Sequence, residues 1–204
     1  MDRRLTPRGR ERRRQLMDFA ARRFAENGYH PTSVAEVVSG MGVGKGVFYW
    51  YFASKEELLI EILREAQYEL RRHQETEIGD EADPVRRIEI GIRASMRWIA
   101  EQRHLSTLFQ FAATEERFAP TMRRGQEVAV ADAARHVQEA VAQGRIHDGD
   151  PLVLTNAILG VTNHLARRYI LEQGRSAEEV ADAAVSFCLH GLLGTAPDRQ
   201  PAVP

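Results

Sequence analysis

The 204-residue sequence has a single cysteine, Cys188, and no long hydrophobic run. One cysteine cannot form an internal disulfide or a Cys-x-x-Cys metal site, which argues against a disulfide-rich secreted scaffold and favours a reducing compartment. The longest uncharged stretches, residues 151–166 and 183–197, are shorter than the roughly 18 to 20 apolar residues that span a membrane. The basic N-terminus also lacks the apolar stretch of a signal peptide. We therefore expect a cytoplasmic protein that does not enter a membrane.

Sequence patterns of catalysis are missing as well. Residues 39–46 resemble a phosphate-binding loop, but the pattern G-x-x-x-x-G-K-[ST] requires glycine at Ser39 and a hydroxyl at Gly46. The seven histidines lack HExxH or i,i+4 spacing, and no G-x-S-x-G motif occurs. Cys188 lies in an apolar segment, which is typical of an inert buried thiol. We expect no enzymatic activity, no metal site and no cofactor.

Lysine is scarce, and the charged residues are unevenly distributed. Lys45 and Lys55 are the only lysines among 28 basic residues. Residues 1–55 hold eleven basic and five acidic residues, a net charge of +6, whereas residues 56–204 hold 17 basic and 24 acidic residues, a net charge of −7. A basic segment joined to an acidic body is expected when one end of a protein meets a polyanion. A solvated basic arm without a partner would carry the same charge.

The hydrophobic spacing predicts an all-α fold of about nine helices, because apolar residues recur with a helical period and no run alternates like a strand. Before residue 80, helices are expected over about 8–27, 33–40, 44–51 and 54–77. Ser33 with Glu36, and Ser54 with Glu57, have the spacing of N-terminal capping boxes. Two short helices joined by a glycine-containing turn are the signature of a helix-turn-helix.

An acidic linker at residues 79–83 separates this part from the rest of the chain. Asp83 followed by Pro84 predicts a helix start, because aspartate caps a helix and proline fits its first position. A short apolar segment at about 105–113 follows the helix that begins there. Three long helices are then expected at about 120–144, 151–172 and 176–194. We therefore predict a basic arm at 1–9, a helix-turn-helix at 33–52, a C-terminal domain at 83–194 and a disordered tail at 195–204.

The last two long helices are apolar around their whole circumference, and such helices are buried on more than one side. Small residues, among them Ala183 and Gly191, permit close helix packing. We predict that two helices from each of two protomers form a homodimer interface. Burial of both helices in the core of a monomer would produce the same pattern.

The third expected helix presents an unusual face. Helical spacing predicts that Val47, Phe48, Tyr51 and Phe52 face the core. It predicts that Lys45, Tyr49 and Trp50 face outward. Exposed aromatic residues beside a lysine are unusual on a solvated helix and fit a surface that meets phosphates and base edges in a major groove. Lys45 and Lys55 both lie at helix starts, where a cation is unfavourable unless a phosphate binds there. Thr32 and Ser33 would add a further phosphate contact. Exposed lysines without a partner are the alternative.

Three segments resemble a known family when they are taken together. They are Phe24-Ala-Glu-Asn-Gly-Tyr29, Thr32-Ser-Val34 and Gly42-Val-Gly-Lys-Gly-Val-Phe-Tyr-Trp-Tyr-Phe-Ala-Ser-Lys-Glu-Glu-Leu58. Together they resemble the N-terminal DNA-binding domain of the TetR family of transcriptional regulators, over about residues 10–70. The resemblance implies a homodimer whose third helices enter successive major grooves of a palindromic operator, and a C-terminal domain that binds a small inducer. The candidate DNA-contacting residues are Thr32, Ser33, Gly44, Lys45, Gly46, Tyr49, Trp50, Tyr51 and Lys55. Family members commonly have serine or threonine at Gly44 and often threonine at Val47, so no operator sequence can be carried over.

The C-terminal domain holds residues that suit a small-molecule pocket, which combines apolar bulk with a few polar groups. The candidates are Met96, Trp98, His104, Phe109, Phe111, Phe118, Met122, Asn163, His164 and Tyr169. They suggest an apolar or aromatic effector, although ordinary core packing would account for any one of them. We predict a ligand-responsive repressor. A constitutive DNA-binding regulator or activator without a ligand is the alternative.

Overall fold

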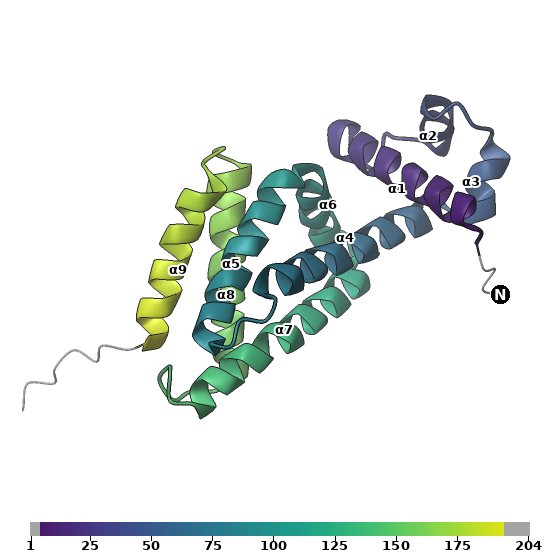
Figure 1. Cartoon of the computed structure of the whole chain (residues 1–204). Coiled ribbons are helices and arrows are strands. Elements are labelled where there is room, and N and C mark those ends of the chain that lie inside the picture. The colour runs from purple at the N-terminus through teal and green to yellow at the C-terminus, as the bar shows by residue number, and fades with distance from the viewer. Residues whose placement is uncertain (1–4, 194–204) are drawn as a thin grey trace, which may run out of the picture. The chain divides into compact units, whose positions relative to one another are not determined.

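The computed structural model describes residues 5–193, with side chains as far as Leu189 (Figure 1). Within this range the chain forms nine α-helices, one π-helix and no strand, so the prediction of an all-α fold is confirmed. The helices are α1 (Pro7–Asn27), α2 (Val34–Gly40), α3 (Lys45–Tyr51), α4 (Lys55–Ile78), α5 (Pro84–Glu101), α6 (Arg103–Thr114), α7 (Ala119–Ala142), α8 (Pro151–Leu165), the π-helix η1 (Ala166–Leu171) and α9 (Ala177–Leu193). None of these helices is long and apolar enough to cross a membrane. The predicted tail at residues 195–204 lies outside the described range.

The chain divides into two compact units. The first joins the residues up to 69 with residues 102–125, and the second joins residues 70–101 with those from 126 onward. Helices α4 and α7 therefore each contribute to both units. Residues 102–125, which the sequence places in the C-terminal domain at 83–194, thus share a compact unit with the helix-turn-helix, and α6, which they contain, packs against α1.

Helix α1 begins earlier than the sequence predicted, because Thr6 and Pro7 form a helix start. The Thr6 hydroxyl accepts a hydrogen bond from the Gly9 amide at 3.2 Å, and Pro7 occupies the first helical position. Of the predicted basic arm at 1–9, residues 7–9 are thus helical, and residues 1–4 lie outside the described range. The helix ends at Asn27, as expected.

The core of the first unit is built from large side chains of α1, α3, α4 and α6, and of the residues directly after α3 and directly before α7. The fully buried ones are Leu16, Phe24, Phe48, Phe52, Leu58, Leu59, Leu63, Leu108 and Phe118. Burying each such side chain is worth about 1.5–3 kcal/mol. Helices of seven residues are not stable alone, so this packing, rather than local propensity, holds α2 and α3 in place.

In the second unit, α5, α8 and α9 lie side by side around an apolar cluster (Figure 1). Met96, Ile170 and Ala184 are fully buried in this cluster. Cys188 is buried there too, and burial raises the pKa of its thiol, which agrees with the prediction of an inert residue. The predicted cap at Asp83 is present, since its side chain accepts a hydrogen bond from the Val85 amide at 3.0 Å, and Asp150 caps α8 in the same way by accepting one from the Leu152 amide at 2.8 Å.

Candidate functional site

The turn between α2 and α3 is fixed by short-range hydrogen bonds. Ser33 and Glu36 form the predicted capping box at the start of α2, with the Ser33 hydroxyl accepting from the Glu36 amide at 3.2 Å and the Glu36 carboxylate accepting from the Ser33 amide at 2.6 Å. After α2, Gly42 adopts a φ of 64°, which L-residues with side chains rarely take. The Val43 amide then donates to the Val38 carbonyl at 3.0 Å. These contacts set the direction in which α3 leaves the turn.

Helix α3 has one buried and one exposed face, as the sequence predicted. Phe48 and Phe52 are fully buried, whereas 56% of Tyr49 and 51% of Trp50 are exposed. Lys45 is exposed as well. Two large aromatic side chains and a cation therefore project from a helix that the core holds rigidly by its opposite face.

The fold leaves the space beside Gly44 and Gly46 open. A Cβ atom built at either position has no heavy atom within 4 Å, and neither residue has a positive φ. Neither packing nor backbone conformation within the protein explains these glycines. Their predicted contact with DNA remains a prediction that agrees with this open space.

Two other candidate residues serve the fold. Thr32 is buried, and its hydroxyl donates to the Gly28 carbonyl at 2.8 Å. The Ser33 hydroxyl is engaged in the capping box. Both hydroxyls thus have hydrogen-bond partners within the protein. The predicted phosphate contact of Thr32 did not take its bond to Gly28 into account.

Lys55 turns into the protein rather than outward. Its ammonium group donates to the carbonyls of Tyr29, His30 and Thr32 at 2.8, 3.2 and 2.9 Å, and its Nζ atom lies 4.3 Å from the centre of the Tyr29 ring. Burial lowers the pKa of Lys55, with a further contribution from Arg117. A lysine ammonium has three donors, and all three have acceptors here. This geometry does not support the predicted phosphate contact and instead makes Lys55 a clamp on the loop between α1 and α2.

Aromatic packing holds the same loop from its other side, a role that sequence reasoning missed. The Tyr29 ring packs at 5.3–5.4 Å between ring centres against Phe24, Phe111 and Phe118. His30 lies 3.3 Å from the carboxylate of Glu115. Phe111 and Phe118 were predicted to line a ligand pocket, but they belong to this cluster, and only the separation of 82 to 89 residues from Tyr29 hid it in the sequence.

The basic residues of α1 fall into two groups. Arg8, Arg10 and Arg12 are exposed on the helix. By contrast, Arg13 pairs with Glu61 at 2.6 Å, and Arg14 pairs with acidic residues of its own helix. The basic charge of the N-terminal segment is therefore partly used within the fold, and the exposed arginines of the first two turns remain for a polyanion.

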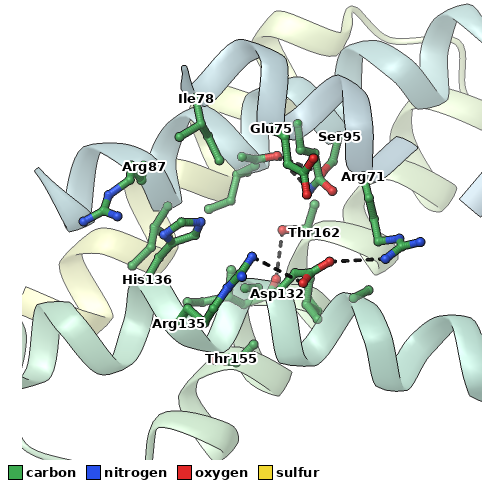
Figure 2. A pocket seen from close by; sticks show the side chains of 18 residues that line it. Arg71, Glu75, Ile78, Arg87, Ser95, Asp132, Arg135, His136, Thr155 and Thr162 are labelled. Carbon is green, nitrogen blue, oxygen red and sulfur yellow. Dashed lines mark hydrogen bonds and ion pairs between the residues drawn. The ribbon is translucent and has the colours of Figure 1, made fainter. Parts of the chain in front are cut away.

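A cavity of about 90 Å³ lies in the second unit, between α4, α5, α7 and α8 (Figure 2). Its apolar wall consists of Ile78, Ile88, Ile92, Ile158 and Leu159 together with small residues. Its polar side chains are Arg71, Gln74, Glu75, Arg87, Ser95, Asp132, Arg135, His136, Thr155 and Thr162. The mixture of apolar wall and polar groups is typical of a small-molecule site.

Ion pairs hold most of the charged groups around this cavity. Asp132 lies between Arg71 and Arg135, with an oxygen 3.3 Å from a guanidinium nitrogen of each. Arg87 pairs with Glu139 at 2.5 Å. Burial lowers the pKa of His136, and the neighbouring Arg87 and Arg135 lower it further. The histidine ring is therefore mostly neutral at pH 7.

None of the ten predicted ligand-binding residues lines this cavity. Met96 and Phe118 are fully buried in cores and Trp98 is 5% exposed, whereas Asn163 and His164 face outward. The others also lie elsewhere: Phe109, Phe111 and Met122 belong to the first unit, and Tyr169 packs on the apolar cluster of the second. The ten candidates therefore do not contribute to this cavity, because aromatic content does not reveal which helix faces meet, and their contact with a ligand stays a prediction.

His104 lines a second cavity, of about 180 Å³, in the first unit between α1, α4 and α6. Burial lowers the pKa of His104, and Arg22 adds to this shift. Burial also raises the pKa of Glu69 in the same cavity. Its lining combines apolar side chains, such as Met17, Ile62 and Leu105, with the charged Asp18, Arg22, Glu65 and Glu69, and these charged groups suit water better than an apolar molecule.

Comparisons with known proteins agree with this architecture. The sequence model described as "Bacterial regulatory proteins, tetR family" matches residues 16–62, and the one described as "Tetracyclin repressor-like, C-terminal domain" matches residues 81–192. The HTH-type transcriptional regulator YdgC of Bacillus subtilis is 23% identical over 190 residues, which cover 91% of this chain and 94% of YdgC.

Solved structures show the same fold. PfmR, a TetR family transcriptional regulator from Thermus thermophilus, is 28% identical with a TM-score of 0.73, over 87% of this chain and 98% of PfmR. FadR from Bacillus subtilis, solved in complex with stearoyl-CoA, is 20% identical with a TM-score of 0.80, over 88% of this chain and 98% of FadR. Because the two family matches together account for most of the sequence, this chain belongs to the TetR family of DNA-binding transcriptional regulators.

Proposed function

We propose that the protein is a homodimeric repressor that binds a palindromic operator and releases it when a small molecule occupies the cavity of the second unit. The observation that carries the DNA-binding part is the exposed face of α3, where Tyr49 and Trp50 project beside Lys45 while Phe48 anchors the helix. Large exposed aromatic residues are unfavourable in water unless a partner covers them. Base edges and phosphates of a major groove would do so.

Exposed apolar side chains on α8 and α9 support the homodimer. Leu152, Val153 and Phe187 are 55%, 64% and 66% exposed. A Cβ atom built at Gly160, also on α8, has no heavy atom within 4 Å, so another helix can approach there closely. The alternative that both helices are buried wholly within one protomer does not agree with these exposures. A two-fold interface through α8 and α9 would cover this surface and would place two α3 helices on one operator.

Linkage would couple the cavity to DNA. Helix α4 supplies Arg71, Gln74 and Glu75 to the cavity, and Lys55, at its other end, clamps the loop that precedes α2. A ligand that binds more tightly to a conformation with the wrong separation of the two α3 helices lowers operator affinity by that preference. For helix-turn-helix dimers, the matching separation is about 34–36 Å. FadR, a protein of this fold, was solved in complex with stearoyl-CoA, and that complex supports a small-molecule effector here.

Genome-wide mapping of binding sites, followed by a ligand screen on the recovered site, tests this proposal. We expect a palindromic sequence that the purified protein binds in a gel-shift assay, derepression of the adjacent gene when the chain is deleted, and release by at least one compound. Loss of expression on deletion would identify an activator instead. A site from which no compound releases the protein would favour the constitutive regulator.

A further inference from the structure

We infer that the effector carries a carboxylate, or another small anionic group, that binds between Arg87 and His136 at one end of the cavity. This inference rests on the proposed function, because it names the chemistry of the molecule that the cavity takes. Its basis is a pair of buried polar atoms that lack hydrogen-bond partners.

The two atoms are Arg87 Nε and His136 Nδ1. Both residues line the cavity, and Figure 2 shows their side chains together on one side of it. The lowering of the His136 pKa by Arg87 agrees with this proximity. A buried donor without an acceptor is costly to a fold, and such atoms in native structures call for a partner. An anionic oxygen between the two side chains would supply it.

The rest of the Arg87 guanidinium is already positioned. Its Nη2 atom donates to Glu139 Oε2 at 2.5 Å, and only 18% of the side chain is exposed. This ion pair fixes the guanidinium plane while the Nε–H group remains without a partner. A donor held in this way recognises a ligand acceptor without further loss of side-chain freedom.

The charges around the cavity favour an anion at this end. Asp132 is held between two arginines, Arg71 and Arg135, and Glu75 lies away from Arg87 and His136 in Figure 2. Asp132 and Glu139 also act electrostatically on His136 and oppose the lowering of its pKa, but within the described residues no carboxylate accepts a hydrogen bond from Arg87 Nε or His136 Nδ1. A neutral His136 can donate from Nδ1 in one tautomer, and an adjacent anion would also favour its protonated form.

The remaining wall limits the ligand in size and polarity. Ile88, Ile92 and Ile158 provide an apolar surface. The cavity volume of about 90 Å³ is smaller than the roughly 150 Å³ that holds benzene in an engineered apolar cavity. This volume limits the effector to a compact carboxylic acid of at most about four carbons. We therefore assign the site to short amphiphilic carboxylates.

Titration of the full-length protein with butyrate, and with butyramide as a neutral molecule of the same shape, tests the inference. We expect butyrate to bind at least about tenfold more tightly than butyramide in calorimetry, because its hydrogen bonds are charge-assisted. In nitrogen-15 NMR spectra, butyrate should shift the Arg87 Nε–H signal and the ring nitrogens of His136. Equal binding of the two compounds, or no binding of butyrate, would overturn the inference.

Three variants locate the contact. Arg87→Gln and His136→Phe are each expected to weaken butyrate binding at least about tenfold. Arg86→Gln is the matched control, because Arg86 is exposed, pairs with Glu89 and does not line the cavity. It should bind butyrate like the wild type. If Arg87→Gln fails to fold, His136→Phe and the wild-type NMR shifts decide, and unchanged binding in His136→Phe with no shift at Arg87 would overturn the assignment.

The operator assay separates this inference from the proposed function. Butyrate that binds between Arg87 and His136 without releasing the operator would contradict ligand release and leave the anion site standing. Release by a neutral compound from a protein that does not bind butyrate would support the repressor and overturn the anion site.

Discussion

Replacing Gly46 with alanine separates the needs of the fold from the needs of DNA binding. Gly46 lies in the first turn of α3 without a positive φ, and a Cβ atom built there has no heavy atom within 4 Å. Alanine is more favourable than glycine in a helix by about 0.5–1 kcal/mol, and no contact would be strained here. We expect the free energy of unfolding to rise by up to about this amount and Tm to rise by about 1–4 °C.

Operator binding should change in the opposite direction. If α3 lies in the major groove, the added methyl group takes space at the DNA surface, and we expect operator affinity to fall at least about tenfold, which corresponds to roughly 1.4 kcal/mol. Fluorescence anisotropy at fixed salt, with the recovered operator and a scrambled duplex of equal length, measures this loss.

Gly91→Ala is the matched control for this variant in assays without an effector, because Gly91 lines the cavity of the second unit. A Cβ atom there is 3.9 Å from Ile78 Cδ1, an ordinary contact within the second unit. This control should gain comparable stability and bind the operator like the wild type. A Gly46→Ala protein that gains stability and keeps full operator affinity would refute a close approach of DNA to Gly46. A Gly46→Ala protein with a lower free energy of unfolding than the wild type would refute the claim that the fold leaves room for a Cβ atom at Gly46.

Four further predictions address other parts of the account. Lys55→Met should lower the free energy of unfolding by about 2 kcal/mol, because three carbonyls lose a charged donor, and should leave the slope of log Kd against log salt unchanged, whereas Lys45→Met should reduce that slope by roughly 0.9. A reduced slope for Lys55→Met would restore it as a phosphate contact. Tyr49→Ala should weaken operator binding far more than binding to random duplex, and equal losses would remove Tyr49 from base readout. Phe187→Glu should sediment as a monomer at micromolar concentration, and a variant that stays dimeric would place the interface elsewhere. Burial lowers the pKa of His136 below its ordinary value of 6.5, so the unfolded chain takes up the proton first as pH falls. The free energy of unfolding should therefore decrease below about pH 6.5 more steeply in the wild type than in His136→Phe, and identical urea-unfolding profiles from pH 7.5 to 5.5 would contradict this.

Features that depend on neighbouring residues could be predicted from the sequence. The capping box of Ser33 and Glu36 and the cap at Asp83 both involve residues within three positions of one another. The two faces of α3 were also predictable, because helical spacing alone separates Phe48 from Tyr49. These local patterns and the motif around α3 identified the fold class and predict the surface that contacts DNA.

Features that depend on distant residues could not be predicted. Lys55 was expected at a phosphate because it opens a helix, but its acceptors lie 23 to 26 residues earlier in the chain. Four helices line the cavity, and hydrophobic periodicity does not specify which sides of them face one another. The polar residues of the cavity include arginines, whereas the predicted ligand-binding residues were mainly aromatic and apolar. In the sequence, Arg87 and His136 are ordinary polar residues of amphipathic helices, and nothing in their spacing indicates that they face one cavity.

Hydroxyl-radical footprinting of the recovered operator, with the wild type and with Trp50→Ala, tests the central claim most directly. The account predicts two symmetric protected segments whose centres lie one helical turn apart, about 34–36 Å, and the loss of both in the variant. A single asymmetric footprint, or protection that survives in Trp50→Ala, would contradict a dimer that reads DNA with the exposed face of α3.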